Sequence, residues 1–276
     1  MDIIDPHLHF FALQEGNYSW LVDSTPPPWK NLDKIKQDHG LKDIQNVALF
    51  ALKGIVHIEA GFDNVHPERE LQWLEKTLGQ FPFKAIAYCP IDAEPNEFLQ
   101  RLEKMPKDAL IGIRDITENE DYQRLLSPNV LANLASLSER SLIWEAQGHF
   151  GLELARKTLL KLALTCPALR IVVTHFGLLE ESENVPDVLQ ELASAPNIWI
   201  KYSGQEMLSN PVETKKAFEL LVATFGEDRI MLASNYPVCL QQMTYEKMWQ
   251  QYLTSWPSPS SFNKVAYLNA KKCYGL

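Results

Sequence analysis

Cysteine is scarce in this chain, and its spacing fits reduced thiols better than a disulfide scaffold. The four cysteines form no C-x-x-C pair and lie far apart, at Cys89, Cys166, Cys239 and Cys273. Scattered thiols of this kind are typical of reduced, cytoplasmic proteins. We also expect no secretory signal, because Asp2 and Asp5 stand where such a signal carries basic residues. The sequence therefore predicts a cytoplasmic protein.

The sequence also lacks long apolar runs and an excess of positive charge. Its longest apolar run, residues 47–56, is interrupted by Lys53, so we expect no membrane-spanning helix. The net charge of −9 argues against nucleic acid and anionic membrane surfaces as main partners, whereas a few local arginines would still accommodate an anionic small substrate. We therefore expect a small-molecule substrate. The sequence leaves the oligomeric state open, a homo-oligomer included.

Proline and aromatic residues cluster in an early segment, residues 11–30. Pro26, Pro27 and Pro28 follow one another there, and no helix interior or central strand accommodates three prolines in a row. The segment is therefore predicted to be a loop, and its length and its two tryptophans, Trp20 and Trp29, favour a lid rather than a linker. A loop packed down by the same tryptophans for stability is an equally good interpretation.

Short apolar segments alternate with helical ones along the whole chain. A polar helix is predicted over residues 31–46, and further helices separate eight predicted strands, at residues 3–10, 55–59, 84–89, 109–114, 141–145, 169–175, 198–202 and 229–233. Such alternation predicts a parallel sheet, and eight units in one domain predict a (β/α)8 TIM barrel over residues 1–276. A doubly wound open sheet is the alternative. It is disfavoured because no glycine-rich phosphate loop follows the first strand.

The first predicted strand carries an alternating polar pattern. Asp5, His7 and His9 occupy every second position, so their side chains share one face of a strand. Two imidazoles at the end of a strand can converge on a metal ion or on a substrate oxygen. A pair of hydrogen-bonded structural histidines is the alternative interpretation.

Nearly every other predicted strand also ends in polar side chains. The carboxyl ends of barrel strands line the active site, so these side chains are candidates for a single site. In chain order they are His57 and Glu59, Tyr88, Arg114 and Asp115, Glu145 and Gln147, Thr174 and His175, Lys201, Tyr202 and Ser203, and Ser234 and Asn235.

Taken in order, these motifs resemble a known family. The D-x-H-x-H of residues 5–9, the T-H-F-G of residues 174–177 and the S-N-Y-P-V of residues 234–238 resemble the amidohydrolase superfamily, of the amidohydrolase-2 type. Its branch of sugar-lactone and pyrone-dicarboxylate lactonases is similar at Tyr18-x-Trp20, at V-H-I-E-A of residues 56–60, at G-I-R of residues 112–114 and at K-Y-S-G of residues 201–204. The matches cover essentially the whole chain.

The resemblance implies a hydrolase that opens a small cyclic ester, such as the lactone of a sugar acid or a related carboxylic acid. Members of this branch differ in metal use, and both alternatives stay open here. With one divalent ion such as Zn, the ligands would be His7, His9 and His175, and the ion would act as a Lewis acid. Without one, the same histidines would donate hydrogen bonds to the substrate carbonyl. No organic cofactor is expected.

The resemblance also implies a set of substrate-binding side chains. Arg114 would hold a substrate carboxylate or ring oxygen through its planar guanidinium group. Glu59, Glu145, Gln147 and Ser203 would orient hydroxyl groups. Tyr202 and Trp20 belong to the matched motifs and complete the set.

One position departs from the family pattern. The last strand usually carries an aspartate as metal ligand and base, and Asn235 occupies that place here. A related subgroup with asparagine has a later aspartate, where this sequence has Cys239. Because an amide is too weakly basic to accept a proton, either Glu59 or Glu145 is predicted to take over proton transfer.

The same departure keeps two other functions open. A metal-dependent decarboxylase of aromatic acids would need a carboxylate on the last strand, which Asn235 does not supply. A barrel that binds a small molecule without catalysis would tolerate the loss. Cys239 is not expected to act as a nucleophile, because no histidine lies near it in sequence.

Overall fold

The computed structural model describes residues 1–23 and 26–276, and a single parallel sheet organises them. Residues 24 and 25 of the predicted lid lie outside the described residues. Neighbouring strands of the sheet follow the order of the chain. They are β1 (Asp2–Leu8), β2 (Ala51–Ile58), β3 (Phe83–Tyr88), β4 (Leu110–Ile116), β5 (Ile143–Gln147), β6 (Ile171–Val173), β7 (Ile198–Tyr202) and β8 (Ile230–Leu232).

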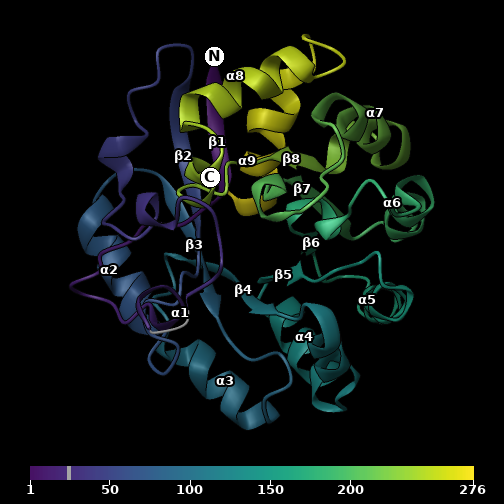
Figure 1. Cartoon of the computed structure of the whole chain (residues 1–276). Helices are drawn as coiled ribbons and strands as arrows, with labels where there is room; N and C mark the ends of the chain where they lie inside the picture. Colours follow the sequence, from purple (N-terminus) through teal and green to yellow (C-terminus); the bar gives the residue numbers. More distant parts are fainter. Residues whose placement is uncertain (24–25) are drawn as a thin grey trace.

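Hydrogen bonds between the ends of β1 and β8 close the sheet into a ring. The His9 N–H donates to the Tyr236 carbonyl at 2.6 Å, and the Asn235 N–H donates to the His7 carbonyl at 2.8 Å. The carboxylate of Asp5 adds a third link, because its Oδ1 accepts from the Ser234 N–H at 3.1 Å. Figure 1 shows this ring of strands inside an outer layer of helices. The predicted (β/α)8 barrel is confirmed.

Amphipathic helices follow the strands and cover the outside of the ring. Helix α2 is representative, since it buries Leu71, Leu74 and Leu78 at a spacing of three and four residues. None of the helices in the described ranges has both the length and the apolar character that a membrane crossing requires. The α-helices are α1 (Ser19–Val22), α2 (Glu68–Leu78), α3 (Pro95–Lys104), α4 (Asn129–Glu139), α5 (Glu153–Thr165), α6 (Val185–Ala193), α7 (Thr214–Phe225), α8 (Tyr245–Ser255) and α9 (Asn269–Tyr274).

The helix predicted over residues 31–46 is wrong. The chain forms two short 3-10 turns there instead, at Leu32–Lys34 and Leu41–Asp43. Gly40 separates the turns in an extended conformation, and Ile35 and Ile44 are the buried hydrophobic residues of this segment. Two buried apolar side chains are too few to hold an amphipathic helix against the barrel, so the segment follows local turn preferences.

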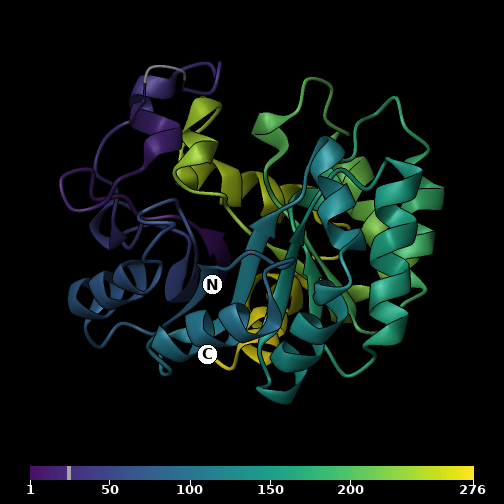
Figure 2. The ribbon, with the colours of Figure 1, turned by 90° about the horizontal axis from the view of Figure 1, so that it is seen from below.

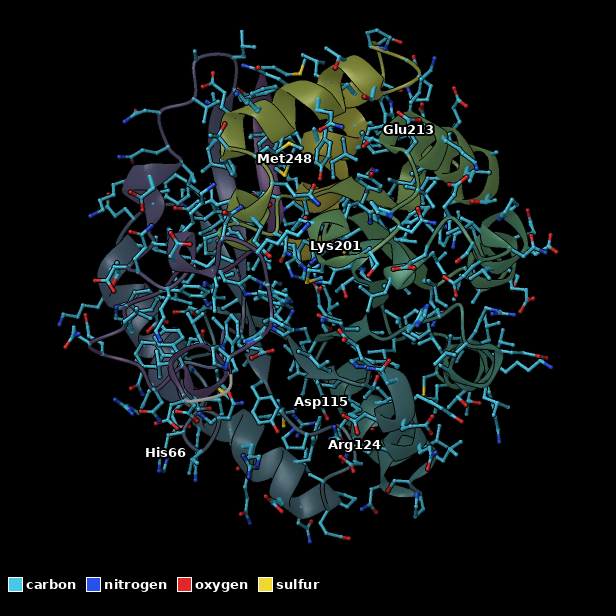
Figure 3. The ribbon with its side chains drawn as sticks, viewed as in Figure 1. His66, Asp115, Arg124, Lys201, Glu213 and Met248 are labelled. Atoms are coloured by element: carbon cyan, nitrogen blue, oxygen red, sulfur yellow. The ribbon has the colours of Figure 1, made fainter. Side chains whose placement is uncertain are left out.

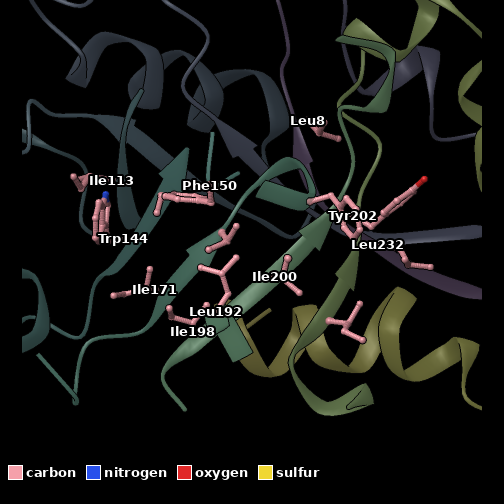
Figure 4. Packing of buried hydrophobic residues seen from close by; sticks show 14 of the residues in the cluster. Leu8, Ile113, Trp144, Phe150, Ile171, Leu192, Ile198, Ile200, Tyr202 and Leu232 are labelled. Carbon is pink, nitrogen blue, oxygen red and sulfur yellow. The ribbon is translucent and has the colours of Figure 1, made fainter. Parts of the chain in front are cut away.

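Two apolar layers fix the strands. The outer layer joins the strands to the helices, and Figure 4 shows Ile113, Trp144, Ile171, Ile200 and Leu232 of five successive strands within it. The inner layer fills the ring with side chains from β1 to β8 and from α9, among them Ile4, Val56, Ile86, Val172, Met231 and Tyr274. In Figure 2 the C-terminal segment lies toward the end from which the strands start, and the N-terminal loop lies toward the opposite end.

Candidate active site

A cavity of about 540 Å³ opens at the carboxyl ends of the strands. Its walls combine aromatic side chains from the N-terminal loop with polar side chains from the strand ends. The residues that line it include Phe11, Trp20, Trp29, His9, Glu59, Tyr88, Arg114, Asp115, Glu118, Gln147, His175 and Asn235. The mouth of the barrel is therefore a site of the size and composition that a small polar molecule requires.

The three predicted histidines lie together at this cavity. The ring of His7 is centred 5.2 Å from that of His9 and 4.4 Å from that of His175. His9 and His175 line the cavity, whereas His7 is fully buried against them. Segments separated by more than 160 residues thus bring three imidazoles into one cluster, because β1 and β6 belong to the same ring.

Hydrogen bonds fix how two of these rings present their nitrogens. The Nδ1 of His9 lies 2.8 Å from the Ile58 carbonyl, which only accepts, so this nitrogen carries the proton. In the neutral ring, the Nε2 of His9 is consequently an acceptor. The Nδ1 of His175 lies 3.0 Å from the Ser203 hydroxyl, which is able to donate or accept. Neither ring nitrogen of His7 has a hydrogen-bond partner among the described residues.

Burial keeps the three imidazoles neutral. The pKa of His7, His9 and His175 is lowered well below its usual value, chiefly because burial disfavours the imidazolium ion. Positive neighbours act in the same direction, with Arg114 lowering the pKa of His9 and of His175. Neutral rings at pH 7 suit metal ligation as well as hydrogen bonding to a substrate.

A strained turn places His175. Directly after β6, His175, Phe176 and Leu178 adopt left-handed backbone conformations with φ of 52°, 56° and 54°. Such conformations are rare for residues with a side chain and persist only where surrounding contacts hold them. The loop after β7 supplies one of these contacts, since a Cβ on Gly204 would lie 2.4 Å from the Nδ1 of His175. Glycine at 204 therefore lets this loop pack directly against the imidazole.

Arg114 lies in the cavity wall and is already paired. Its Nε donates to Glu59 Oε1 at 2.8 Å, its NH2 group to the Glu59 carbonyl at 2.7 Å, and its NH1 group to Gln147 Oε1 at 2.8 Å. Gln147 in turn donates to Glu118 at 2.7 Å. Burial raises the pKa of Glu59, and the charge of Arg114 opposes that rise. Arg114 and Glu59 thus form a neutral pair at the site.

Glu145 lies below the cavity and does not line it. Glu145 and Lys201 are fully buried, and the Lys201 Nζ donates to the two carboxylate oxygens at 2.6 and 2.7 Å and to the Pro6 carbonyl at 2.6 Å. The hydroxyl of Tyr274 donates to the same carboxylate at 2.5 Å. Figure 3 places Lys201 inside the ring of strands. This geometry gives Glu145 an ion-pairing role and no direct contact with the cavity.

Two further predicted residues also lie away from the cavity surface. The Tyr202 hydroxyl donates to Thr214 Oγ1 at 3.2 Å and faces a second, smaller cavity. Ser203 is fully buried beside His175. Neither residue lines the main cavity, so the structure supports contact through His175 for Ser203 and no substrate contact for Tyr202.

His57 and Cys239 have structural roles and take no part in the site. The Nε2 of His57 lies 2.9 Å from Glu70 Oε1, and its Nδ1 accepts from the Phe10 N–H, so both ring nitrogens are engaged. Cys239 is buried, and burial raises the pKa of its thiol well above the usual value. A thiol in that state is a poor nucleophile, in agreement with the expectation for Cys239.

The N-terminal loop is docked onto the barrel. The backbone N–H groups of Asn17 and Tyr18 donate to the carbonyls of Phe62 and Gly61, and the Trp20 indole donates to the Ala60 carbonyl at 2.8 Å. Trp20 and Trp29 pack edge to face and line the cavity. The described part of the loop thus forms a wall of the site and packs against the loop after β2.

Glu206 is a neighbour of the site that the sequence analysis did not identify. It follows β7, and its Oε1 accepts a hydrogen bond from the Asn235 side-chain amide at 2.6 Å. Burial raises the pKa of Glu206 to about 7. No spacing pattern in the sequence marks this residue, because the contact joins loops that follow two different strands.

The histidine cluster fits a divalent ion in its chemistry. His7 has two buried nitrogens without partners, and the neutral His9 ring leaves Nε2 as an unprotonated donor atom, as metal binding requires. In residues 1–23 and 26–276, however, no group of three or more His, Cys, Asp or Glu side chains is arranged closely enough to hold an ion. The described side chains therefore supply suitable ligands in an arrangement that is not closed around a metal.

Nearly the whole sequence matches one family model. Residues 4–276 match the model described as amidohydrolase, amidohydrolase-2 type. A curated relative, the uncharacterized protein y4mH of Sinorhizobium fredii, is 26% identical over 271 residues, which cover 91% of this chain and 90% of the relative.

Solved structures share the fold at low sequence identity. An amidohydrolase from Burkholderia multivorans with bound zinc superposes with a TM-score of 0.78 at 17% identity, over all of both chains. A putative 2-pyrone-4,6-dicarboxylic acid hydrolase from Pseudomonas putida superposes with a TM-score of 0.71 at 17% identity, over 99% of this chain and 97% of the other. The structural likeness agrees with the match over residues 4–276, and the chain belongs to the amidohydrolase family.

Proposed function

We propose that this chain is a hydrolase of a small cyclic ester, the uncharged lactone of a sugar acid. The observation that carries the proposal is the lining of the main cavity, where His9, His175 and Glu59 face the same space. Lactone hydrolysis needs a polarised carbonyl, an oriented water and an acceptor for one proton. This cavity contains a group for each of these tasks.

The carbonyl of the lactone would be polarised by the imidazole N–H of His175. If the Ser203 hydroxyl donates to the Nδ1 of His175, the proton of the neutral ring resides on Nε2, which then donates to the carbonyl oxygen. His7 packs 4.4 Å from His175, ring centre to ring centre, and supports that ring without lining the cavity itself. Donors held by buried partners stabilise the negative charge that develops during attack.

The water would be oriented by His9 and deprotonated by Glu59. The Nε2 of His9 accepts a hydrogen bond from the water, because the Nδ1 proton is held by Ile58. Glu59 accepts the proton as the water oxygen bonds to the carbonyl carbon. It then returns that proton to the ring oxygen when the C–O bond breaks, which yields the hydroxy acid. Of the two glutamates predicted for this role, Glu59 lines the cavity and Glu145 does not.

Charge pairing in the cavity favours an uncharged substrate. Arg114 is the one Lys or Arg side chain among the described residues that line the cavity, and Glu59 already neutralises it. Glu118 and Asp115 add negative charge to the same wall. A substrate with free carboxylates would find no unpaired cation here, whereas hydroxyl groups would find carboxylate and amide acceptors beside two indole rings.

A divalent ion is compatible with the same site. His7, His9 and His175 would hold it, and it would supply Lewis-acid polarisation of the carbonyl and lower the pKa of a water molecule. Glu59 remains the proton acceptor in either case, since it lines the cavity independently of the histidines. Elemental analysis of protein purified without added metal distinguishes the two cases.

The proposal is tested by a panel of lactones assayed for acid release with and without added divalent metal. We expect turnover of uncharged sugar lactones to exceed that of pyrone dicarboxylates by at least about tenfold in kcat/KM. Faster turnover of the dicarboxylates would refute the substrate class. No turnover of any lactone by folded protein, in either metal condition, would refute the hydrolase.

A binding protein without catalysis is the second candidate, and Asn235 is the observation that favours it. This second candidate predicts that the native chain binds a sugar lactone without cleaving it and that only N235D releases acid. A decarboxylase is disfavoured, because its aromatic acid substrate would meet the paired Arg114 and no last-strand carboxylate. Loss of CO₂ from an aromatic acid incubated with the protein would reverse that judgement.

A further inference from the structure

Asn235 has a fixed backbone, and its side-chain amide is held on one side by Glu206. Its N–H donates to the His7 carbonyl at 2.8 Å, and its carbonyl accepts from the Cys239 N–H at 3.2 Å. Its φ of 55° lies in the left-handed region, which asparagine tolerates better than most residues. The position of Cβ is therefore set by the closure of the barrel. The remaining choice is which end of the planar amide faces the main cavity.

Glu206 determines that choice. Asn235 lines the main cavity, whereas Glu206 lines the second cavity of about 280 Å³ on the other side. The Asn235 Nδ2 donates to Glu206 Oε1 at 2.6 Å, so the amide nitrogen faces Glu206 and the amide oxygen is left for the main cavity. Burial raises the pKa of Glu206 to about 7, and above that pH the ionised carboxylate only accepts hydrogen bonds, so it selects this orientation over the flipped one.

No cationic side chain among the described residues lines the cavity beside Glu206. The described residues that line the second cavity include no Lys, Arg or His, and the Asn235 amide is the side chain that donates to Glu206. The second acid in that cavity, Glu213, is engaged elsewhere, because it accepts from the Lys216 N–H at the start of α7. Figure 3 shows Glu213 at the α7 end of the molecule.

We propose that Glu206 is a positioning residue which replaces the missing last-strand aspartate by holding Asn235 with its amide oxygen toward the main cavity. In that orientation Asn235 accepts a hydrogen bond from a water or a substrate hydroxyl. An aspartate would accept the same bond. A released amide would be free to flip, and the flipped form presents Nδ2–H as a donor in place of the acceptor oxygen.

The first test does not depend on enzymatic activity. In the full chain labelled with 15N-asparagine, the side-chain NH₂ signal of Asn235 is assigned by its absence in N235D. We expect this signal to shift in E206A and to return toward its native position when formate is added, because formate refills the space that the carboxylate leaves. E213Q is the matched control, and it should leave the signal in place.

An Asn235 signal that is unchanged in E206A overturns the proposal. So does a shift of equal size in E213Q, since a general change of the second cavity would then explain both. If E206A does not fold, E206Q gives the same readout, with a smaller shift in the same direction because a neutral acceptor replaces the carboxylate.

The second test rests on the proposed function. On a lactone that the wild type hydrolyses, E206A should lower kcat about 10- to 100-fold and change KM by less than about threefold, because orientation at the reacting atoms is lost and binding is retained. Formate should restore part of kcat in E206A and none in N235A. A wild type without lactonase activity refutes the proposed function alone, and the NMR result then decides the role of Glu206.

Discussion

Replacing Glu145 with glutamine should strongly destabilise the barrel. Glu145 and Lys201 are fully buried, and three hydrogen bonds of 2.6 to 2.7 Å join the Lys201 ammonium to Glu145 and Pro6. Burial lowers the pKa of Lys201, and the charge of Glu145 opposes that shift. E145Q removes the opposing charge, so Lys201 must either lose its proton or remain an unpaired ion inside the ring of strands.

The expected loss of stability in E145Q arises because the buried Lys201 ammonium is left without its partner. Removing one partner of a buried ion pair lowers the free energy of unfolding by about 3 to 5 kcal/mol. For a protein of this size, each kcal/mol lowers Tm by about 2 to 4 °C, so E145Q should melt about 6 to 20 °C below the wild type. Calorimetry at pH 7 measures this difference.

Two controls distinguish a lost ion pair from a general effect of the substitution. The double variant E145Q/K201M removes both charges and should recover most of the lost stability, because two uncharged side chains need no mutual compensation. E153Q removes a carboxylate from an exposed pair with Lys157 and should not change Tm measurably. A Tm of E145Q within about 2 °C of the wild type, or a double variant less stable than E145Q, would refute the reasoning.

Three other predictions concern the site and its surroundings. Because burial raises the pKa of Glu59 and the ionised form is the base, kcat/KM should fall on acidification at a pH above the ordinary glutamate value, and E59Q should lose this acid limb in a pH-rate profile. W20A should raise KM more than it lowers kcat, since Trp20 forms a wall of the cavity, and equal KM values for W20A and wild type would contradict this. With a thiol reagent in native protein, the partly exposed Cys166 should react before the buried Cys239, as peptide mapping would show.

The sequence predicted the position of the site better than the role of each member. Parallel strands in a ring bring all their carboxyl ends together, so His9, Glu59 and His175 could be assigned to one mouth without knowing any distance. The depth at which each side chain lies along its strand could not be predicted in this way. Glu145 and Gln147 are two residues apart on β5, yet Gln147 lines the cavity and Glu145 lies below it beside Lys201.

The contacts that the sequence did not reveal are those between loops. Glu206 meets Asn235 because the turns after β7 and β8 pack side by side, and no periodicity encodes that contact. The pairing of Arg114 with Glu59 is a similar case, since each residue alone suggested a role toward substrate. The helix predicted over residues 31–46 was wrong for another reason. Helix propensity favoured it, but too few apolar residues face the barrel to hold a helix there.

The most direct measurement of the central claim is the initial rate on one sugar lactone, compared among site variants under identical conditions. We predict that H175N and E59Q lose at least about 100-fold in kcat, as expected for a lost oxyanion donor and a lost base. H66N, at an exposed histidine labelled in Figure 3, should match the wild type. Wild-type rates in both H175N and E59Q would contradict the assignment of this cavity as the place where the ester is cleaved.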